Sequence, residues 1–572
     1  MRDLQLGRVA QLFVRVFKGT IDQLKRADRI YESARMSIRT ILIHDVSLRL
    51  GESEQDLLRA VTRKLKIGRQ RVQNLEIRKR SLDCRRGRPP RWIHSVVIET
   101  ETSIAERLLA KGSARPWSPE RVEIPEYAGN DSPVVIGTGP AGLFCAMRLI
   151  QAGARPRVIE RGPEVVERSR RWNRFIRGDG FEPECNLLYG EGGAGAYSDG
   201  KLYTRVQDPR VVEVLETLVE YGAPKEILTD GRPHVGSNLL PSVVKRMRND
   251  LIQKGAQFFF DHRFIDFVSS EQGDSSRLTG LKIEHQGEVS QWEAQTIFLA
   301  SGHSARDVYR CLSRHEVPMT RKPFQLGVRI EHPQEVINAI QYGDSAGHSH
   351  LPPADYSLVA KSEDGEVYSF CMCPGGEILP SSEREGYLCV NGASRYQRRS
   401  PWANSGFVVT LEPELFGAGE DPLAGILLQE QIEKAAYDSA GGNFAVPALR
   451  LSDFLMGKIS ENLPECSYPR ALTATDFAEF LPEFILEPLR SGLRELVRRI
   501  PEFNHEDAVV TAPESRSSSP VRIDRDEVTF ESSGLGGLYP LGEGAGYAGG
   551  ILSAALDGMK AAESWATTNQ SC

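Results

Sequence analysis

The chain has 572 residues, of which 40% are hydrophobic and 26% are charged, and its net charge is −6. A usual domain size of roughly 150 residues predicts three or four domains with ample core. No apolar run approaches the roughly 18–20 residues of a membrane span, and Arg15 interrupts the short apolar stretch that a signal peptide would need. The nine cysteines are irregularly spaced, which favours a reduced, cytoplasmic compartment over a disulfide framework.

Residues 1–36 show no pattern that predicts packing. They are mixed and weakly amphipathic, with no helix cap and no clear core stripe. Met36 directly precedes the first strand-like stretch. We therefore expect translation to start at Met36, or residues 1–36 to be an extension that is not part of the fold.

Residues 37–126 alternate between strand and helix patterns, in an order that makes up most of a ferredoxin-like α+β domain. Pro116, Pro119 and Pro125 mark the linker that ends it. The predicted elements are a strand over 38–43, a helix over 57–65, strands over 72–82 and 92–99, and a helix over 104–110.

The strongest signal lies in residues 133–160. A short apolar strand runs into a Gly-x-Gly-x-x-Gly turn, a helix of small and apolar residues, and a second strand that ends at Glu160, 23 residues after Gly137. Gly137 permits the tight turn, and Gly139 lets a pyrophosphate approach the backbone. Gly142 lets the helix pack close to the strand. The helix N-terminus attracts phosphate, and Glu160 can accept hydrogen bonds from an adenosine ribose, so the segment predicts dinucleotide binding.

Three further loops of glycine and other small residues lie next to buried strands. Residues 187–201 contain five glycines, four of them between 190 and 195, and residues 296–303 end in Ala-Ser-Gly-His. Residues 538–550 run from an apolar strand into a third glycine-rich loop and the helix 551–562. Such loops suit close backbone approach to a large planar ligand. Their number predicts a ligand about as long as FAD.

The order of these segments resembles a family of bacterial FAD-dependent dehydrogenases or oxidoreductases within the glutathione-reductase-like FAD-binding superfamily. The resemblance covers nearly everything from Met36 to the C-terminus. The segments that carry it, besides the loops above, are Lys79–Asp83, Ser301–Asp307, Lys322–Phe324, Arg329–Pro333, Cys371–Gly376 and Arg516–Arg522.

The resemblance implies an α/β multidomain fold with a glutathione-reductase-like Rossmann domain for FAD in two pieces, 127–323 and 506–572. Residues 324–505 would form an inserted middle domain that covers the flavin and binds substrate. In that superfamily an acid at the position of Glu543 faces the ribityl chain, and the helix after Gly549 and Gly550 points its N-terminus at the flavin pyrimidine ring. The residues expected to bind FAD are Gly137, Gly139, Pro140, Ala141, Gly142, Glu160, Arg161, Gly192, Gly193, Ala194, Gly195, Ser198, Asp199, Ala300, Ser301, Gly302, Gly542, Glu543, Gly549, Gly550 and Ile551.

Three residues are candidates for the chemistry. Cys371 and Cys373 would share one face of a strand and form a thiol redox centre, or they are simply small buried residues. His303 could transfer protons near a flavin, because the unperturbed pKa of histidine is about 6.5. The alternative is that it is a hydrogen-bonded structural histidine. No spacing of His and Cys resembles a zinc site, so no metal is expected.

Other polar residues leave two interpretations open. Glu331 and His332, like His303, either transfer protons near the flavin or have a structural role. Arg516 and Arg522 bracket a serine run, which predicts either a clamp for an anionic group or a tie between two loops.

Taken together, the sequence predicts an oxidoreductase in which non-covalent FAD carries hydride or electrons to or from an unidentified small-molecule substrate or electron-transfer partner. The alternative is an RNA-associated flavoprotein or binding module. It rests on residues 63–91, where twelve Lys or Arg face only two acids and can attract an anionic partner or form a solvated face. Residues 205–505 contain no second dinucleotide turn, so NADH and NADPH are expected to bind weakly or not at all.

Overall fold

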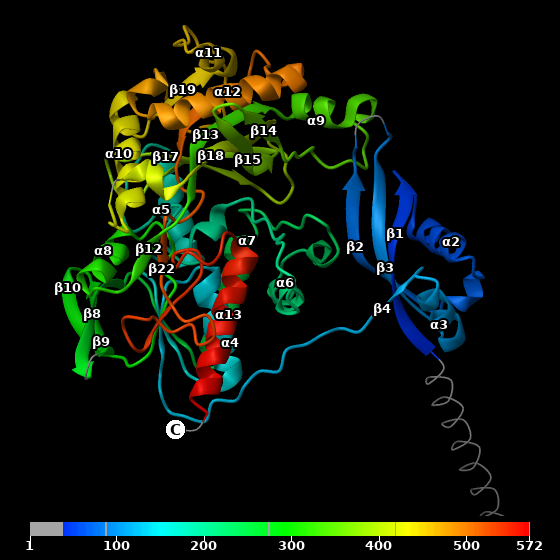
Figure 1. The fold of residues 1–572 in the computed structure, drawn as a ribbon, viewed down its shortest axis with the longest axis horizontal. Coiled ribbons are helices and arrows are strands. Elements are labelled where there is room, and N and C mark those ends of the chain that lie inside the picture. The colour runs from blue at the N-terminus through cyan, green and yellow to red at the C-terminus, as the bar shows by residue number, and fades with distance from the viewer. Residues whose placement is uncertain (1–37, 86–87, 273–274, 418, 571–572) are drawn as a thin grey trace, which may run out of the picture. The chain divides into compact units, whose positions relative to one another are not determined.

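The computed structural model describes residues 38–85, 88–272, 275–417 and 419–570, which form two compact units (Figure 1). Of the described residues, those up to Glu120 together with Thr229–Gly231 form unit 1, and Arg121–Leu228 together with those from Arg232 onward form unit 2. The extension predicted at residues 1–36 lies outside the described residues.

The described part of unit 1 contains a four-stranded antiparallel sheet and two α-helices. Its elements are β1 (Ile38–Arg49), α2 (Glu54–Leu65), β2 (Asn74–Asp83), β3 (Arg91–Glu101), α3 (Thr102–Ala110) and β4 (Arg115–Pro116). Along the chain the order is strand-helix-strand-strand-helix-strand, which is the element order of a ferredoxin-like unit. In the sheet the strands lie in the order β2-β3-β1-β4. Alternate residues of β1, Ile41 and Ile43, are buried against Leu57, Val61 and Leu65, which recur at helical spacing on α2.

Unit 2 is built around a five-stranded parallel sheet in the order β23-β11-β5-β6-β7. Its three central strands are fully or almost fully buried, as expected for a parallel sheet. The elements of this layer are β5 (Val134–Ile136), α4 (Pro140–Ala152), β6 (Arg157–Ile159), β7 (Gln257–Phe259), β11 (Ile297–Leu299), β23 (Leu538–Pro540) and α13 (Ile551–Thr568).

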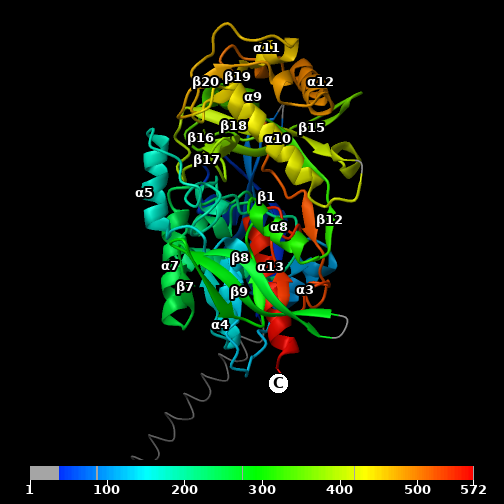
Figure 2. The same cartoon turned by 90° about the vertical axis from the view of Figure 1, so that its left-hand side faces the viewer.

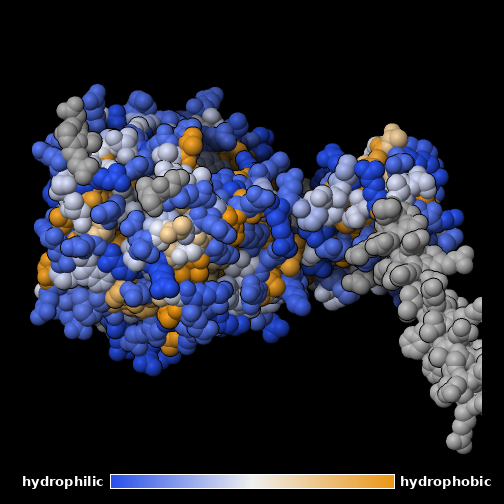
Figure 3. Space-filling view, turned by 90° about the horizontal axis from the view of Figure 1, so that it is seen from below, coloured by the Kyte–Doolittle hydropathy of each residue, from blue (hydrophilic) through white to orange (hydrophobic). Residues whose placement is uncertain are grey.

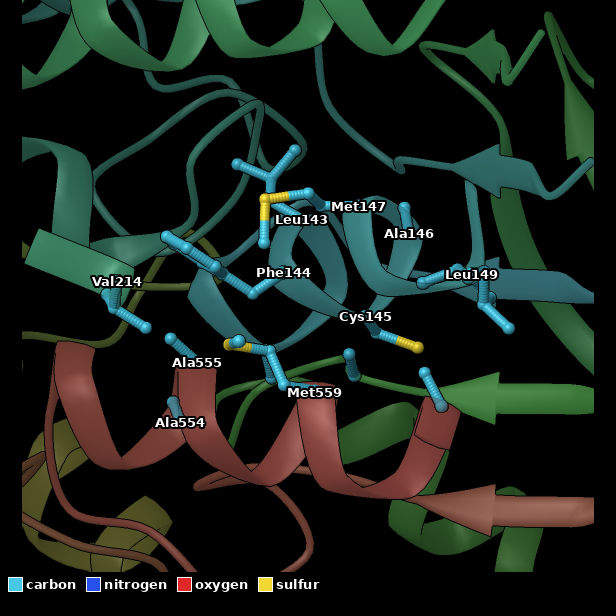
Figure 4. Packing of buried hydrophobic residues seen from close by; sticks show 14 of the residues in the cluster. Leu143, Phe144, Cys145, Ala146, Met147, Leu149, Val214, Ala554, Ala555 and Met559 are labelled. Atoms are coloured by element: carbon cyan, nitrogen blue, oxygen red, sulfur yellow. The ribbon is translucent and has the colours of Figure 1, made fainter. Parts of the chain in front are cut away.

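Helices α4 and α13 come from opposite ends of unit 2 in sequence and pack directly against each other (Figure 4). Phe144 on α4 lies on the side that faces Ala555 and Met559 on α13, and all three are buried. A Cβ atom at Gly558 would lie 2.1 Å from the carbonyl oxygen of Ala141. The two helices therefore approach too closely at this point for any side chain.

Between β6 and β12 the chain adds helices and a small sheet. The three-stranded antiparallel sheet β10-β9-β8 is inserted between β7 and β11. The elements are α5 (Val165–Ile176), α6 (Arg210–Glu220), α7 (Leu240–Gln253), β8 (Arg263–Gln272), β9 (Ser275–His285), β10 (Glu288–Glu293) and α8 (Arg306–Arg314).

A seven-stranded sheet in the order β14-β15-β18-β13-β21-β19-β20 forms the second layer of unit 2, at the end opposite α4 and α13 (Figures 1 and 2). Helix α12 packs against β13, β14, β15 and β18, and the hairpin β16-β17 packs against β15, β18 and β21. The elements are β13 (Phe324–Pro333), α9 (Gln334–Tyr342), β14 (Val359–Ser362), β15 (Gly365–Pro374), β16 (Gly376–Ser381), β17 (Cys389–Ser394), β18 (Trp402–Leu411), α10 (Ala424–Ser439), β19 (Val446–Arg450), α11 (Leu451–Met456), β20 (Leu472–Ala474), α12 (Glu483–Arg499) and β21 (Val509–Glu514).

Two short strands mark where the chain leaves the parallel-sheet layer and returns to it. β12 (Met319–Arg321) pairs antiparallel with β22 (Val521–Ile523). The seven-stranded sheet lies wholly between them in sequence. It includes β21, so it extends past residue 505, where the sequence placed the end of the middle domain.

The face of the molecule in Figure 3 is mostly hydrophilic, with hydrophobic residues scattered among polar ones. Among the described residues, no helix is both long enough and apolar enough to cross a membrane.

Candidate functional site

Unit 2 contains a cavity of about 920 Å³ between the parallel-sheet layer and the seven-stranded sheet. The volume is within the range of roughly 300–1,000 Å³ that is typical of ligand and cofactor sites. One wall comes from the turn between β5 and α4, the loop 193–206, residues 300–305 and the loop that leads into α13. The other wall includes Ser369, Phe370 and Cys371 of β15 and Asn391 of β17.

Most of the residues predicted to bind FAD lie on this cavity. All of them line it except Gly142, Gly192 and Gly542. A Cβ atom at Gly142 would lie 1.9 Å from the carbonyl oxygen of Gly137, and one at Gly542 would lie 2.8 Å from the Cβ of Ala141. Gly142 and Gly542 therefore have packing roles behind the cavity wall.

The cavity wall has the form that a flavin dinucleotide needs. Cβ atoms placed at Gly139, Gly549 and Gly550 would meet no protein atom within 4 Å, and none of the three has a φ that excludes a side chain. Internal packing does not explain why these positions lack side chains. A ligand that lies directly on the backbone does explain it, so the residues present fit FAD.

Two helices begin at the cavity. The N-cap of α4 is Gly139 and its first residue is Pro140, which is pre-organised for the first helical turn. Helix α13 begins at Ile551, and its first turn also lines the cavity. Each N-terminus presents unpaired backbone N–H groups and a partial positive charge.

Glu160 follows β6 and is 5% exposed. Its Oε2 accepts hydrogen bonds from the backbone N–H and the hydroxyl of Thr138, at 3.0 and 2.6 Å. Its Oε1 accepts hydrogen bonds from the backbone N–H groups of Gly162 and Gly190, both at 3.1 Å. The carboxylate thus connects the dinucleotide turn to the loop at 190, while its contact with a ribose remains a prediction.

Arg168 on α5 is fully buried and was not predicted from the sequence. Its guanidinium donates hydrogen bonds to the carbonyl oxygens of Asn186, Leu187, Gly190, Glu191 and Gly193. It therefore fixes the glycine-rich loop that forms part of the cavity wall. An arginine on an amphipathic helix gives no sequence signal for such a role.

Arg161 also lines the cavity, but its charge is already paired. It donates to both carboxylate oxygens of Glu184 at 2.6 and 3.0 Å and to Asp307 at 3.0 Å. Its guanidinium carbon lies 4.1 Å from the ring centroid of Tyr189. These contacts orient the arginine at the edge of the cavity.

His303 and Glu543 lie next to each other on the cavity wall, with Nδ1 of His303 3.5 Å from Oε1 of Glu543. Burial, reinforced by the charge of Arg516, lowers the pKa of His303 to about 3. Burial raises the pKa of Glu543 to about 7, against the opposing charge of Lys322. Near pH 7 the imidazole is neutral, and Glu543 is the group of this pair that can gain or lose a proton.

The two cysteines of β15 differ in their surroundings. The pairing of β15 with β18 shifts register between Phe370 and Cys373, and Cys371 has a φ of +46°. This bulge leaves Cys371 on the cavity wall, whereas Cys373 is fully buried and does not line it. The expectation that both cysteines face the flavin assumed a regular strand, which the bulge interrupts.

A charged group lies beside Cys371. The Nζ of Lys201 is 4.0 Å from the Cys371 sulfur and 3.9 Å from Oδ2 of Asp199. The neighbouring Cys373 thiol and the charge of Lys201 lower the pKa of the Cys371 thiol below its usual range. Lys201 lines the cavity and was not predicted as a site residue, although it follows the glycine-rich loop directly.

Asp199 lines the cavity but is engaged by the protein. Its Oδ2 accepts a hydrogen bond from Arg398 at 3.0 Å, and its Oδ1 accepts one from the Ser394 hydroxyl. Its side chain is 1% exposed.

The other candidates take structural contacts. Arg516 and Ser517 line the cavity, but Arg516 already pairs with Glu433 at 2.7 Å and with Glu383, and the hydroxyls of Ser517 and Ser518 donate to Gln325. The hydroxyl of Ser467 donates to Glu331, and the His332 ring lies 2.7 Å from the Phe503 carbonyl oxygen. Neither Glu331 nor His332 lines the cavity.

In the part of the chain that the structure describes, Asp266, Cys311 and His315 form a group of possible metal ligands. His315 Nε2 lies 2.7 Å from Asp266 Oδ1, and the Lys282 ammonium is 3.6 Å from the same carboxylate. None of the three ligand residues lines the cavity. The neighbouring Lys282 ammonium is already paired with the Asp266 carboxylate, and its charge opposes a metal ion there.

Among solved structures, the chain is similar to a triple mutant of the flavin-dependent brominase Bmp2, with 13% identity, a TM-score of 0.35, and coverage of 77% of this chain and 81% of that chain. It is also similar to a geranylgeranyl bacteriochlorophyll reductase-like protein from Thermoplasma acidophilum, with 14% identity, a TM-score of 0.32, and coverage of 77% and 80%. The match to THI4 of Thermovibrio ammonificans covers 33% of this chain and 63% of that chain, at 16% identity and a TM-score of 0.23. These similarities are too distant to assign an activity.

Residues 323–517 match the model of a family described as FAD-dependent protein, C-terminal domain-like, and residues 40–94 match a domain of unknown function, DUF8436. The first match coincides with the segment between β12 and β22. A protein of Clostridium beijerinckii, described as uncharacterised, is 38% identical over 535 residues, which cover 91% of this chain and 98% of that protein. The chain therefore belongs to the same family as the Clostridium protein, a family of FAD-dependent proteins, and its cofactor is FAD.

Proposed function

We propose that the protein is an FAD-dependent oxidoreductase that binds FAD non-covalently in the cavity of unit 2 and transfers hydride or electrons to or from a substrate. The observation that carries the proposal is the pairing of two unlike walls. One wall has glycines with open space at Gly139, Gly549 and Gly550, and the facing wall carries the ionisable Cys371. A wall suited to a cofactor facing a wall with reactive groups is the arrangement of a redox active site.

The parallel sheet, the turn at Gly139 and the return of the chain through β23 and α13 support a glutathione-reductase-like FAD domain. The N-terminus of α4 would hold the pyrophosphate, and Gly139 would let it approach the backbone. The N-terminus of α13 would stabilise negative charge on the reduced flavin, by about 0.3–1 kcal/mol or more where it is buried.

When bound, FAD supplies reversible two-electron chemistry. The chain's own residues would orient substrate and manage protons around it. The pKa of Glu543 is raised to about 7, so this carboxyl can donate or accept a proton at its Oε atoms near neutral pH. His303, held neutral beside it, would orient the Glu543 carboxyl.

Anaerobic flavin reduction tests this proposal. The purified protein should be yellow with about one FAD per chain, and one class in a panel of reduced donors should bleach the flavin band faster than it bleaches free FAD. The reduced protein should then recover its colour with a matching oxidised acceptor. A protein that purifies without flavin and does not take up added FAD would contradict the proposal.

The alternative of an RNA-associated module is less well supported. In unit 1, Arg71, Arg80 and Arg85 each pair with a carboxylate, and the guanidinium groups of Arg78 and Arg80 stack on tryptophan rings at 4.7 Å. Part of the basic charge is therefore neutralised within the unit. Co-purified nucleic acid that dissociates with increasing salt would favour this alternative.

A further inference from the structure

The wall of the cavity opposite the glycines contains a strained position. Cys371 is one of the few non-glycine residues with a positive φ, at +46°, and it lies in the bulge of β15. Such a conformation persists only where the surrounding structure enforces it, and it is concentrated at functional sites. Bulges also re-aim side chains, and this one leaves Cys371 on the cavity wall.

Lys201 is fixed beside this sulfur. Its ammonium lies 4.0 Å from the Cys371 Sγ, donates a hydrogen bond to the carbonyl oxygen of Met372, and lies 3.9 Å from Asp199. Asp199 is itself held by Arg398 at 3.0 Å. An ammonium at this distance favours the thiolate form of the cysteine, whereas a cysteine that only fills space gains nothing from it.

Cys373 supplies the second thiol. Its Sγ lies 3.2 Å from the carbonyl oxygen of Cys371, so its side chain turns back toward the neighbouring cysteine. It is fully buried, and the neighbouring Cys371, together with this burial, raises the pKa of the Cys373 thiol and keeps it protonated. The pair thus consists of an accessible thiolate and a protected thiol, the arrangement of an attacking and a resolving cysteine.

We infer that Cys371 and Cys373 form a dithiol–disulfide couple that exchanges two electrons with FAD, and that the substrate of the cavity is a thiol or its disulfide. This inference rests on the proposed function. In the oxidative direction, the Cys371 thiolate and the Cys373 thiol form one S–S bond. Their two electrons and the Cys373 proton pass to FAD, which gives the anionic reduced flavin. No other reactant is consumed, and charge is conserved.

The couple connects the cavity to a substrate through Cys371 alone. A small thiol that enters the cavity can attack the Cys371 sulfur of the disulfide, form a mixed disulfide and release the Cys373 thiol. A second thiol then releases the oxidised substrate as its disulfide and restores the Cys371 thiolate. Electrons therefore enter at Cys371 without a nicotinamide site.

Counting electrons in the holoprotein tests the inference. Anaerobic titration of the air-oxidised protein with dithionite should consume four electrons per FAD, two for the flavin and two for the disulfide. Cys371→Ser and Cys373→Ser should each consume two. Cys389→Ser is the matched control, because Cys389 is buried on the neighbouring β17 and does not line the cavity, and it should still consume four.

A second measurement uses the wild-type protein and does not depend on variants that fold. The holoprotein is incubated in air, unfolded, and alkylated with iodoacetamide. Mass spectrometry should then show the peptide that contains Cys371 and Cys373 two hydrogens lighter and unalkylated. After prior reduction, both cysteines should be alkylated.

Lys201 has a separate readout. In the reduced protein, Lys201→Met should shift the alkylation profile of Cys371 to higher pH, and Lys201→Arg should keep it low. The groups that face this sulfur are Lys201, Arg329, Asp199 and Cys373. If the alkylation profile of Cys371 in Lys201→Met matched that of wild type, Lys201 would not stabilise a thiolate at Cys371.

Two electrons per FAD in the wild type, with both cysteines recovered as thiols after exposure to air, would overturn the couple. The proposed function would survive that result, because the flavin would still be reduced by a donor that is not a thiol. A protein that binds no flavin would instead overturn both.

Discussion

Gly137 and Gly139 are two residues apart in the same turn, but they are glycine for different reasons. A Cβ atom at Gly137 would lie 2.3 Å from the carbonyl oxygen of Ala300, and its φ is +101°. A Cβ atom at Gly139 would meet nothing within 4 Å. The fold therefore requires glycine at 137, whereas internal packing does not require it at 139, where we expect the pyrophosphate of FAD to lie on the backbone.

Gly139→Leu should consequently abolish FAD binding without unfolding the protein. We expect the FAD content to fall from about one per chain to near zero, while the melting temperature of the flavin-free protein stays within a few degrees of wild type. Absorbance at the flavin band and circular dichroism measure the two effects. Gly180→Leu is the control, since its Cβ also meets open space but it does not line the cavity. Full flavin occupancy in Gly139→Leu would place the pyrophosphate elsewhere.

The residues that the sequence revealed are those whose type is unusual for their position. Closely spaced glycines and an acid at the end of a strand are recognisable in the sequence alone, and most of these residues line the cavity. Arg168 and Lys201 did not stand out, because an arginine on a helix and a lysine in a loop are ordinary. Their importance comes from burial and from partners distant in sequence. The bulge at Cys371 was equally invisible, since it depends on how β15 pairs with β18.

At the scale of elements, α4 and α13 depend on Gly558. By helix propensity alone, Gly558→Ala would stabilise α13 by about 1 kcal/mol. Its Cβ would, however, lie 2.1 Å from the Ala141 carbonyl oxygen, which is backbone and cannot move aside cheaply. We expect a net destabilisation of about 1–3 kcal/mol and weaker FAD binding, measured as a lower melting temperature and a higher Kd for FAD.

Thr568→Ala is the control for this variant because Thr568 is exposed at the end of the same helix. It should change stability by about 0.5 kcal/mol or less. A Gly558→Ala protein as stable as wild type would show that the helices can separate without cost.

Helices α8 and α10 are joined by a buried charge cluster. Glu433 on α10 accepts hydrogen bonds from Arg306 on α8 at 2.8 Å and from Arg516 at 2.7 Å. Burial alone would raise the pKa of Glu433, but Arg306 and Arg516 outweigh it and hold the pKa well below the ordinary value of 4.5. The folded pKa is thus below the unfolded one. The stabilisation is present above about pH 4.5 and is lost as the pH falls toward the folded pKa.

Glu433→Gln should therefore lower the melting temperature at pH 7, since removing one partner of a buried ion pair costs about 3–5 kcal/mol. Its melting temperature should also fall less steeply than that of wild type below pH 4.5. Glu495→Gln, which removes the partly exposed partner of the exposed Arg498, should differ little from wild type at pH 7 or below pH 4.5. Parallel curves for wild type and Glu433→Gln would show that another group controls the acid sensitivity.

At the scale of the whole molecule, the arrangement of sheets leads to an expectation about the electron donor. A two-dinucleotide flavoenzyme would carry a second strand, glycine turn and helix for NAD(P)H. In the described residues of the seven-stranded sheet, the parallel pair β19 and β20 is joined through α11 without such a glycine turn. A nicotinamide dinucleotide would lack helix-dipole support for its pyrophosphate.

Micromolar NADH or NADPH should accordingly leave the flavin oxidised under anaerobic conditions over minutes, while dithionite reduces it at once. Stopped-flow absorbance at the flavin band makes the comparison. Rapid bleaching that saturates at one tight nicotinamide site would contradict this expectation.

The element order of unit 1 and the parallel-sheet layer were predictable because periodicity and turn residues are local signals. The topology of residues 324–514 was not. Its strands pair across long separations, such as β13 with β21, and long-range pairing leaves no mark on either strand alone. For the same reason the sequence placed the end of the middle domain at 505, before β21, which joins the sheet only through distant partners.

The pairing of β12 with β22 has an evolutionary consequence. Because β12 pairs with β22, the two ends of the segment between them, residues 322–520, lie about one strand spacing apart, roughly 4.8 Å. A gap that short can be closed by a tight turn, so the segment between them can be exchanged, lengthened or removed without stretching the parallel sheet. Because that segment carries Cys371 and the wall around it, descendants of one ancestral flavin module could acquire new substrates by replacing a single insert.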